Sequence, residues 1–117
     1  MALTSVGNIG TNNSTTAGVT LTVTAAAQLD AGNLGILVIA VDNQSTTDGN
    51  TSEVSTVVDT ALNIWTKLRE FCNGQGAADA GATVSVWYTI ADANLPITTG
   101  VVTITLANSK TAKAASI

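Results

Sequence analysis

The sequence contains no histidine and a single cysteine, Cys72, among its 117 residues. Mechanisms that use an imidazole base, and zinc or iron sites built on histidine, are therefore excluded. One cysteine cannot form an internal disulfide, and it cannot hold zinc or an iron–sulfur cluster by itself. Because no histidine is present to activate the thiol, we expect Cys72 to be a buried apolar side chain.

Charged residues are also scarce, at 10% of the chain, compared with about 25% in an average globular protein. All four basic residues lie after position 66, and the net charge is -4. Because binding to phosphate groups needs clustered Lys and Arg, we expect neither a nucleic-acid nor a membrane partner. Two explanations of the low charge stay open. Copies of the chain or a partner cover the surface, or a secreted or particle-borne protein exposes mainly hydroxyl and amide groups.

Long apolar runs and targeting segments are missing as well. The longest apolar run, LGILVIAV at 34–41, is far shorter than the ~20 residues that span a bilayer. The start of the chain, MALTSVGNIGTNN, has neither the basic region nor the apolar core of a signal peptide. We therefore expect synthesis in the cytoplasm without export. The length predicts one domain over residues 1–117.

Strand patterns dominate what is present. Residues 19–24, 81–91 and 101–107 alternate between two faces. The first segment places Val19, Leu21 and Val23 on one face, and the last places Val102, Ile104 and Leu106 inward. The second separates Val84, Val86 and Tyr88 from Ser85, Trp87 and Thr89. Residues 34–42 are almost continuously apolar, which predicts a central strand covered on both faces.

Polar, turn-rich segments at 43–53, 73–81 and 91–100 separate these strands, and the last contains the only proline. No alternation of strands with helices is present. This arrangement predicts an all-β fold, an antiparallel β-sandwich of jelly-roll-like type, with an immunoglobulin-like sandwich as the alternative.

The segment VVDTALNIWTKLREF at 57–71 is ambiguous on its own. Its apolar residues recur every three or four positions, as in a helix, but Thr, Asp and Asn inside it form helices poorly. We interpret it as a β-hairpin with a turn at 59–63. Trp65 then lies on one face of the second strand, and Ile64 and Leu68 lie on the other.

The carboxylates offer the remaining candidates for catalysis or metal binding: Asp42, Asp48, Glu53, Asp59 and Glu70. A pair of them could perform acid–base chemistry on a glycoside, but we interpret them as solvated loop residues. Residues 42–53 have the length of a calcium-binding loop, yet the position of the glycine does not fit an EF-hand. An irregular calcium site at Asp42, Asp48 and Asn50 is a weaker alternative. We predict no enzyme activity, no cofactor and no metal site.

Two residues are the candidates for contact with a partner or ligand, Trp65 and Trp87. Tryptophan rings stack on sugars and are enriched at interfaces. Both residues also lie inside strand patterns, where a place in the core is the usual alternative.

Several motifs follow one another in the second half of the chain: Asp59, Asn63, WTK at 65–67, NGQGAA at 73–78, GATVSVW at 81–87, TTGVVTIT at 98–105 and TAKAA at 111–115. With these motifs the chain resembles a group of structural proteins of tailed bacteriophages, and the likeness covers about half of the sequence. It implies a β-sandwich on the virion, in a capsid-decoration, tail or fibre role, with no catalytic residues. Leu62 departs from the glycine that is usual there. The chain ends at Ile117, where similar proteins continue, which predicts a sheet edge closed by a neighbouring subunit.

These observations lead to one expectation and one alternative. We expect a capsid decoration (cement) protein that resides in the virion and binds the major capsid protein as a homo-oligomer, with a trimer as one candidate state. Residues 1–16 are expected to form an arm that is flexible or becomes ordered on a partner. The alternative is a tail-fibre or receptor-binding module that recognises glycans through Trp65 or Trp87 and the loop at 43–53.

Overall fold

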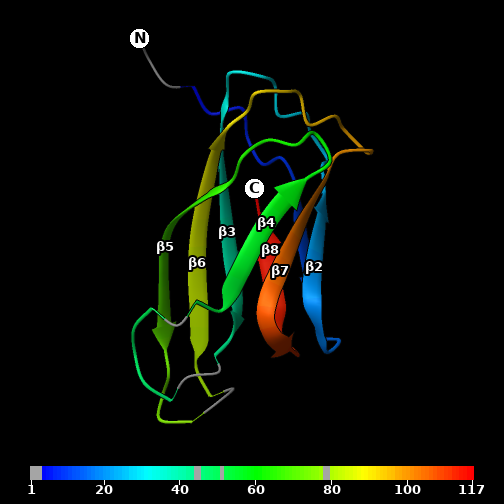
Figure 1. Cartoon of the computed structure of the whole chain (residues 1–117). Coiled ribbons are helices and arrows are strands. Elements are labelled where there is room, and N and C mark those ends of the chain that lie inside the picture. Colours follow the sequence, from blue (N-terminus) through cyan, green and yellow to red (C-terminus); the bar gives the residue numbers. More distant parts are fainter. Residues whose placement is uncertain (1–3, 44–45, 51, 78–79) are drawn as a thin grey trace.

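The regular structure in the described part of the chain consists of β-strands. The computed structural model describes residues 4–43, 46–50, 52–77 and 80–117. Eight strands follow in the order β1 (Thr11–Ser14), β2 (Gly18–Thr24), β3 (Leu34–Asp42), β4 (Val54–Asp59), β5 (Thr66–Asn73), β6 (Ala82–Ile90), β7 (Val101–Lys110) and β8 (Lys113–Ser116). The longer strands run along the long dimension of the molecule (Figure 1). Within the described ranges, no helix has the length and apolar character needed to cross a membrane.

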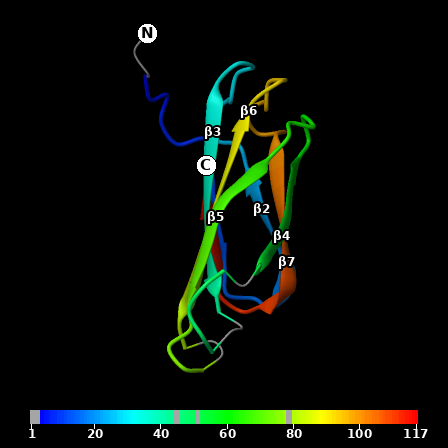
Figure 2. The ribbon, with the colours of Figure 1, turned by 60° about the vertical axis from the view of Figure 1, so that its left-hand side comes forward.

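The strands form two sheets that pack face to face. The larger sheet has the order β1-β8-β3-β6-β5, and the smaller has the order β2-β7-β4. Every ladder between strands is antiparallel. Figure 2 shows the two sheets nearly edge-on, with β3, β5 and β6 in one layer and β2, β4 and β7 in the other. The prediction of an all-β, antiparallel β-sandwich is therefore confirmed.

Inward-facing side chains of both sheets make the core. The larger sheet contributes Leu37, Ile39, Val41 and Trp87, and the smaller contributes Leu21, Val23, Val57, Val102, Ile104 and Leu106. The alternation predicted for 101–107 is confirmed. Val19 is 46% exposed, so its predicted place beside Leu21 and Val23 is wrong. The register of β2 against β7 shifts between Gly18 and Thr20, which breaks the alternation at this end of the strand. Cys72 is a buried free thiol, as predicted.

The chain passes from one sheet to the other after Asp59. The strand–turn–strand interpretation of 57–71 is right, and a helix is absent from this described segment. The hairpin is wrong, because β4 pairs with β7 whereas β5 pairs with β6. Trp65 is buried while Ile64 and Leu68 are exposed, as predicted, but Ile64 and Trp65 precede β5, which begins at Thr66. Sequence periodicity indicated the strands correctly but carried no information about their partners.

The carboxylate of Asp59 holds this crossing in place. Its Oδ1 accepts hydrogen bonds from the backbone N–H of Ala61 (2.9 Å) and of Asn63 (3.0 Å). Its Oδ2 accepts from Asn63 Nδ2 (3.1 Å) and from Trp65 Nε1 (2.8 Å). One buried carboxylate therefore fixes the turn and orients the indole that enters the core.

Part of the segment expected to be an arm belongs to the sandwich. Residues 11–14 form β1, which pairs with β8. Ile9 is buried, and its N–H donates to the carbonyl oxygen of Ile117 at 2.7 Å. Strand β8 lies between β1 and β3, so the C-terminal strand is not a sheet edge. Ordering of the N-terminal segment on a partner stays a prediction.

Candidate interaction surface

The solvent-facing side of the larger sheet, here called the outer face, carries many large apolar side chains. They are Leu34, Ile36 and Val38 on β3, Val84, Val86, Tyr88 and Ile90 on β6, and Leu68 and Phe71 on β5. Leu34 and Ile36 are each 50% exposed, and Val38 is 44% exposed. The prediction that both faces of this strand are covered is therefore wrong. The face toward the core is covered, and the outer face is open to solvent.

These side chains form one continuous patch because they are cross-strand neighbours. Leu34 pairs with Ile90, Ile36 with Tyr88, and Val38 with Val86 across the β3–β6 ladder. On the other side of β6, Val84 pairs with Phe71. Side chains directly opposite each other on antiparallel strands have Cβ atoms about 5 Å apart, so they touch. Contiguous exposed apolar patches of this kind mark interaction sites.

The other half of the outer face is lined by small side chains. Ala114 on β8 lies between Ala40 on β3 and Asn13 on β1, and Ser116 is the next outward-facing residue of β8. All four are wholly or partly exposed. Two adjoining shallow hollows of about 330 and 300 Å³ lie over this region. The outer face therefore has a raised half over β6 and β5 and a low half over β8 and β1.

Few positive charges reach the outer face, because most basic side chains of the chain are paired or hydrogen-bonded within the sandwich. Lys110 Nζ lies 2.7 Å from Glu53 Oε2, and both side chains are almost fully buried. Lys67 Nζ lies 3.1 Å from Glu70 Oε2. Lys113 is buried and donates to backbone carbonyl oxygens, including that of Lys110 at 2.9 Å. The surface is consequently even poorer in cations than the composition suggests.

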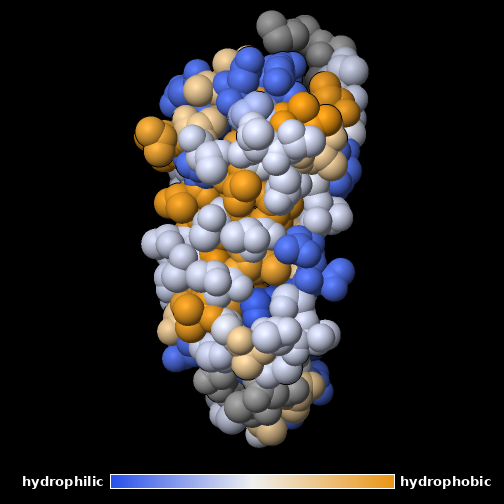
Figure 3. Space-filling view, turned by 90° about the vertical axis from the view of Figure 1, so that its right-hand side faces the viewer, coloured by the Kyte–Doolittle hydropathy of each residue, from blue (hydrophilic) through white to orange (hydrophobic). Residues whose placement is uncertain are grey.

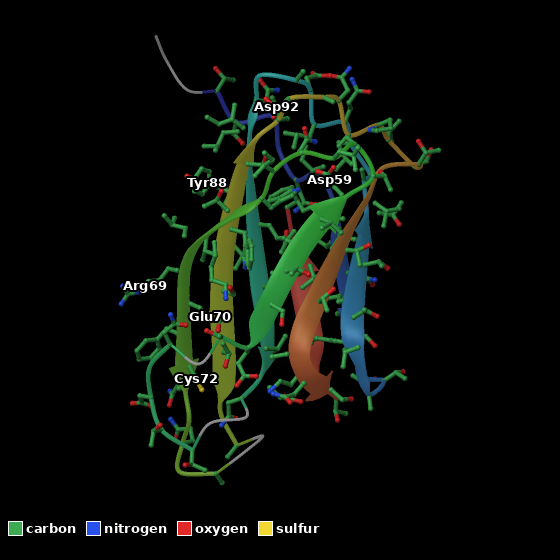
Figure 4. All side chains as sticks on the ribbon, viewed as in Figure 1. Asp59, Arg69, Glu70, Cys72, Tyr88 and Asp92 are labelled. Carbon is green, nitrogen blue, oxygen red and sulfur yellow. The ribbon has the colours of Figure 1, made fainter. Side chains whose placement is uncertain are left out.

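Among the residues that the structure describes, Arg69 is the exposed basic side chain, and Asp42 is a partly exposed acid at the end of β3. Figure 4 shows Arg69 directed away from the sandwich, whereas Glu70 on the same strand points toward the smaller sheet. On the right-hand side of the view in Figure 1, strongly hydrophilic residues form separate patches, and hydrophobic residues reach the surface between them (Figure 3).

Both tryptophans predicted as candidate contacts lie in the core. Trp65 and Trp87 are each 7% exposed. The indole N–H of Trp65 donates to Asp59, and that of Trp87 donates to Ser85 Oγ at 2.9 Å. Lys67 Nζ lies 5.3 Å from the centroid of the Trp87 ring, within the range of a cation–π contact. The core alternative is confirmed for both rings, and a direct contact with a partner or ligand stays a prediction.

Sequence reasoning missed the outer face, although a signal for it was present. Val84, Val86 and Tyr88 make the more apolar side of their strand, and Ser85 and Thr89 are on the other side. The structure buries the side with the hydroxyl groups and exposes the apolar side. Neighbouring strands with apolar residues on both faces cannot turn both faces toward one core. The sequence could therefore have indicated an apolar face on the outside.

The polar loops give no metal site in the described ranges. Residues 44, 45 and 51 of the loop at 43–53 lie outside those ranges. Asp48 Oδ1 accepts from Gly74 N (3.0 Å), and Asp42 Oδ2 accepts from Ala112 N (2.8 Å). No three His, Cys, Asp or Glu side chains of the described residues come together as a metal site.

Three of the candidate carboxylates are not the solvated loop residues that we predicted. Glu53, Asp59 and Glu70 are at most 5% exposed. Glu70 accepts the backbone N–H groups of Glu53 (2.5 Å) and Val54 (3.2 Å), in addition to its ion pair with Lys67. These carboxylates hold loops and strands together inside the sandwich.

No protein-family model, no curated protein and no solved structure matches this chain. The resemblance to structural proteins of tailed bacteriophages therefore stays a prediction from the motifs quoted above.

Proposed function

We propose that this protein is a structural component of a virion, a capsid decoration protein of a tailed phage that binds the major capsid protein as a homo-oligomer. The observation that carries this proposal is the continuous apolar patch on the outer face. Leaving such a patch in water is unfavourable, and monomeric soluble proteins seldom do so. The function consistent with it is a stable contact with other protein surfaces, without catalysis.

The order of the strands supports a jelly-roll type for the sandwich. In a jelly roll the chain folds back on itself as one long hairpin, so the first strand pairs with the last, the second with the seventh, and the third with the sixth. The ladders β1–β8, β2–β7 and β3–β6 follow this rule. Strand β5 departs from it, because it joins β6 rather than β4. Immunoglobulin-like sandwiches keep their last two strands in one sheet, whereas β7 and β8 belong to different sheets.

Jelly rolls are common in viral capsid proteins, but they also occur in lectins and cupins. A fold alone therefore does not decide the function. The virion role draws its support from the motif resemblance together with a surface suited to assembly. Many copies on a shell would multiply modest contacts, since each copy bound beside another binds at a high effective concentration.

The alternative, a tail-fibre or receptor module that binds glycans, has less support. Both indoles that would stack on a sugar are buried. Exposed aromatic rings do occur on the outer face, at Phe71 (48% exposed) and Tyr88 (36% exposed). Glycan-array binding that disappears in Tyr88→Ala while the circular dichroism spectrum is unchanged would favour this alternative over decoration.

Copy number per particle tests the proposal. Particles are purified on a density gradient from cells that express the coding sequence with its neighbouring genes, and the protein is quantified by mass spectrometry. A decoration protein is expected in about as many copies as a capsid lattice has joints, hence hundreds. A few copies per particle would indicate a fibre, and absence from particles that contain the major capsid protein would refute the virion role.

A further inference from the structure

We infer that the outer face is covered by a second copy of this chain, in a two-fold dimer whose axis runs along β3. This inference rests on the proposed homo-oligomeric function and names the contact that makes the oligomer. Three features carry it: the position of β3 in the sheet, the size of the side chains on either side of β3, and the extent of the face.

Strand β3 is the middle strand of the larger sheet, with β8 and β1 on one side and β6 and β5 on the other. When two copies pack face to face about a two-fold axis parallel to β3, the side-to-side order of the strands in one sheet is reversed in the sheet that lies over it. Strand β8 then lies over β6 of the partner, and β1 lies over β5. The low half of one outer face therefore meets the raised half of the other.

The register of the ladders tells which side chains would meet. Ala114 and Val84 both align with Ala40, so Ala114 of one copy faces Val84 of the other. Ser116 and Val86 both align with Val38, so these two face each other in the same way. A small side chain thus opposes a larger one in both of these rows, the rows that β8 shares with β3 and β6. A two-fold interface must be complementary to itself, and this pairing meets that requirement.

The outermost strands, β1 of one copy and β5 of the other, also oppose a smaller side chain to a larger one. Asn13 aligns with Ala114, and Phe71 aligns with Val84, so Asn13 of one copy faces the partner's Phe71. The hollows of about 330 and 300 Å³ lie over the low half, where they would receive side chains of the raised half. An axis perpendicular to the strands would place each strand over its own copy. Large side chains would then crowd over β6, and gaps would remain over β8.

Charges do not oppose this arrangement. Arg69 aligns with Val86, and Thr11 aligns with Ser116. Each Arg69 would therefore lie against the partner's Thr11, and the two arginines would stay at opposite edges of the interface. The two copies of Asp42 are at the end of the face, and the angle of about 30° between aligned packed sheets moves them apart.

The area of the face suits a dimer of this type. The outer face is made of four residues each from β1 and β8, nine each from β3 and β6, and eight from β5. At about 4.8 by 3.3 Å for each residue, these strands span about 540 Å². A standard stable interface buries about 800 Å² on each partner. A corrugated surface has more accessible area than its outline, so the outer face supplies most of the area of a standard dimer contact.

The first test compares two Val→Asp variants by sedimentation equilibrium. Val38 lies at the centre of the outer face, and Val58 is an exposed valine of β4, on the smaller sheet. We expect twice the chain mass of 11.7 kDa for the wild type and for Val58→Asp. Val38→Asp buries two carboxylates at the axis and should weaken the dimer at least about 100-fold. Circular dichroism checks that both variants fold.

Cysteine cross-linking with a short bis-maleimide tests the direction of the axis. Cys72 is fully buried and serves as the unreactive background. Val38→Cys should cross-link to itself, and Val58→Cys should not. A mixture of Ala114→Cys and Val84→Cys should cross-link, whereas either protein alone should not. Efficient cross-linking of Ala114→Cys to itself would overturn the axis along β3.

The outcomes separate this inference from the proposed function. A wild-type monomer, a trimer, or a dimer that survives Val38→Asp would overturn the inference. If the purified chain is monomeric but Val38→Asp removes it from particles, another virion protein covers the face, and the decoration role stands. If the chain dimerises as described but is absent from particles, the inference stands and the virion role fails.

Discussion

Removing the Asp59 carboxylate should lower the free energy of unfolding, because this carboxylate holds the segment that crosses from one sheet to the other. Its two oxygens accept four hydrogen bonds at 2.8–3.1 Å, two from backbone N–H groups, one from the Asn63 amide and one from the Trp65 indole. Hydrogen bonds to a charged group contribute roughly 1.5–3 kcal/mol each. The four are not additive, because in Asp59→Ala some donors regain water at the turn. We therefore expect a loss of about 3–5 kcal/mol, at the upper end of the range for single substitutions.

Urea unfolding followed by tryptophan fluorescence measures this loss, because Trp65 is itself one of the donors. Asp92→Ala is the matched control, since Asp92 is an exposed acid at the same end of the sandwich (Figure 4). Substitutions at such exposed positions usually change the free energy of unfolding by less than about 0.5 kcal/mol. All variants are compared at one protein concentration, because association with a second copy adds to apparent stability. A loss below about 1 kcal/mol for Asp59→Ala, or equal losses in both variants, would refute the reasoning.

Three further substitutions or reagents test the interior. In Gly35→Ala the new Cβ would meet Leu29 at 2.9 Å and the Trp65 ring at 3.3 Å. We expect this overpacking to lower the free energy of unfolding by about 1–3 kcal/mol, measured by thermal unfolding. An unchanged Tm would contradict this expectation. Lys110→Met leaves Glu53 as a buried charge, so it should lower the free energy of unfolding measured in urea by about 3–5 kcal/mol. Adding Glu53→Gln to the same chain should restore much of this loss. Losses that simply add in the double variant would argue against a coupled pair. Cys72 is fully buried, so a thiol reagent should modify it only after unfolding, and rapid labelling of the native protein would show that β5 opens.

The strands could be predicted from the sequence because their cause is local. Period-two alternation in segments such as 101–107 reports which side chains share a face, and β7 follows it. The partner of a strand depends on residues far away in the chain. Nothing within 57–71 indicates that β4 pairs with β7 and β5 with β6. The hairpin failed for that reason, while the strand–turn–strand order and the orientation of Trp65 were correct.

Hydrophobicity alone did not locate the candidate site, because it does not state whether the core or solvent lies against an apolar face. The apolar run at 34–42 predicted burial on both sides, yet Ile36 and Val38 are on the outer face and half exposed. The tryptophans were chosen because rings often form contacts, but their N–H groups find partners inside, at Asp59 and Ser85. The same limit applies to acids. A loop acid and a buried ion-pair acid such as Glu53 look alike until the fold brings Lys110 beside one of them.

The sheet edges explain why association would use a face and not an edge. Strands β2, β4 and β5 are sheet edges, and each has a register shift against its neighbour, at Gly18/Thr20, Val54/Thr56 and Lys67/Arg69 respectively. The remaining edge strand, β1, has four residues. Irregular or short edge strands are poor templates for a further strand, and natural proteins use both features against edge-to-edge aggregation. Protected edges and mostly internal cations are consistent with the proposed association through the outer face, and we expect this contact to persist at high salt because apolar burial is not screened.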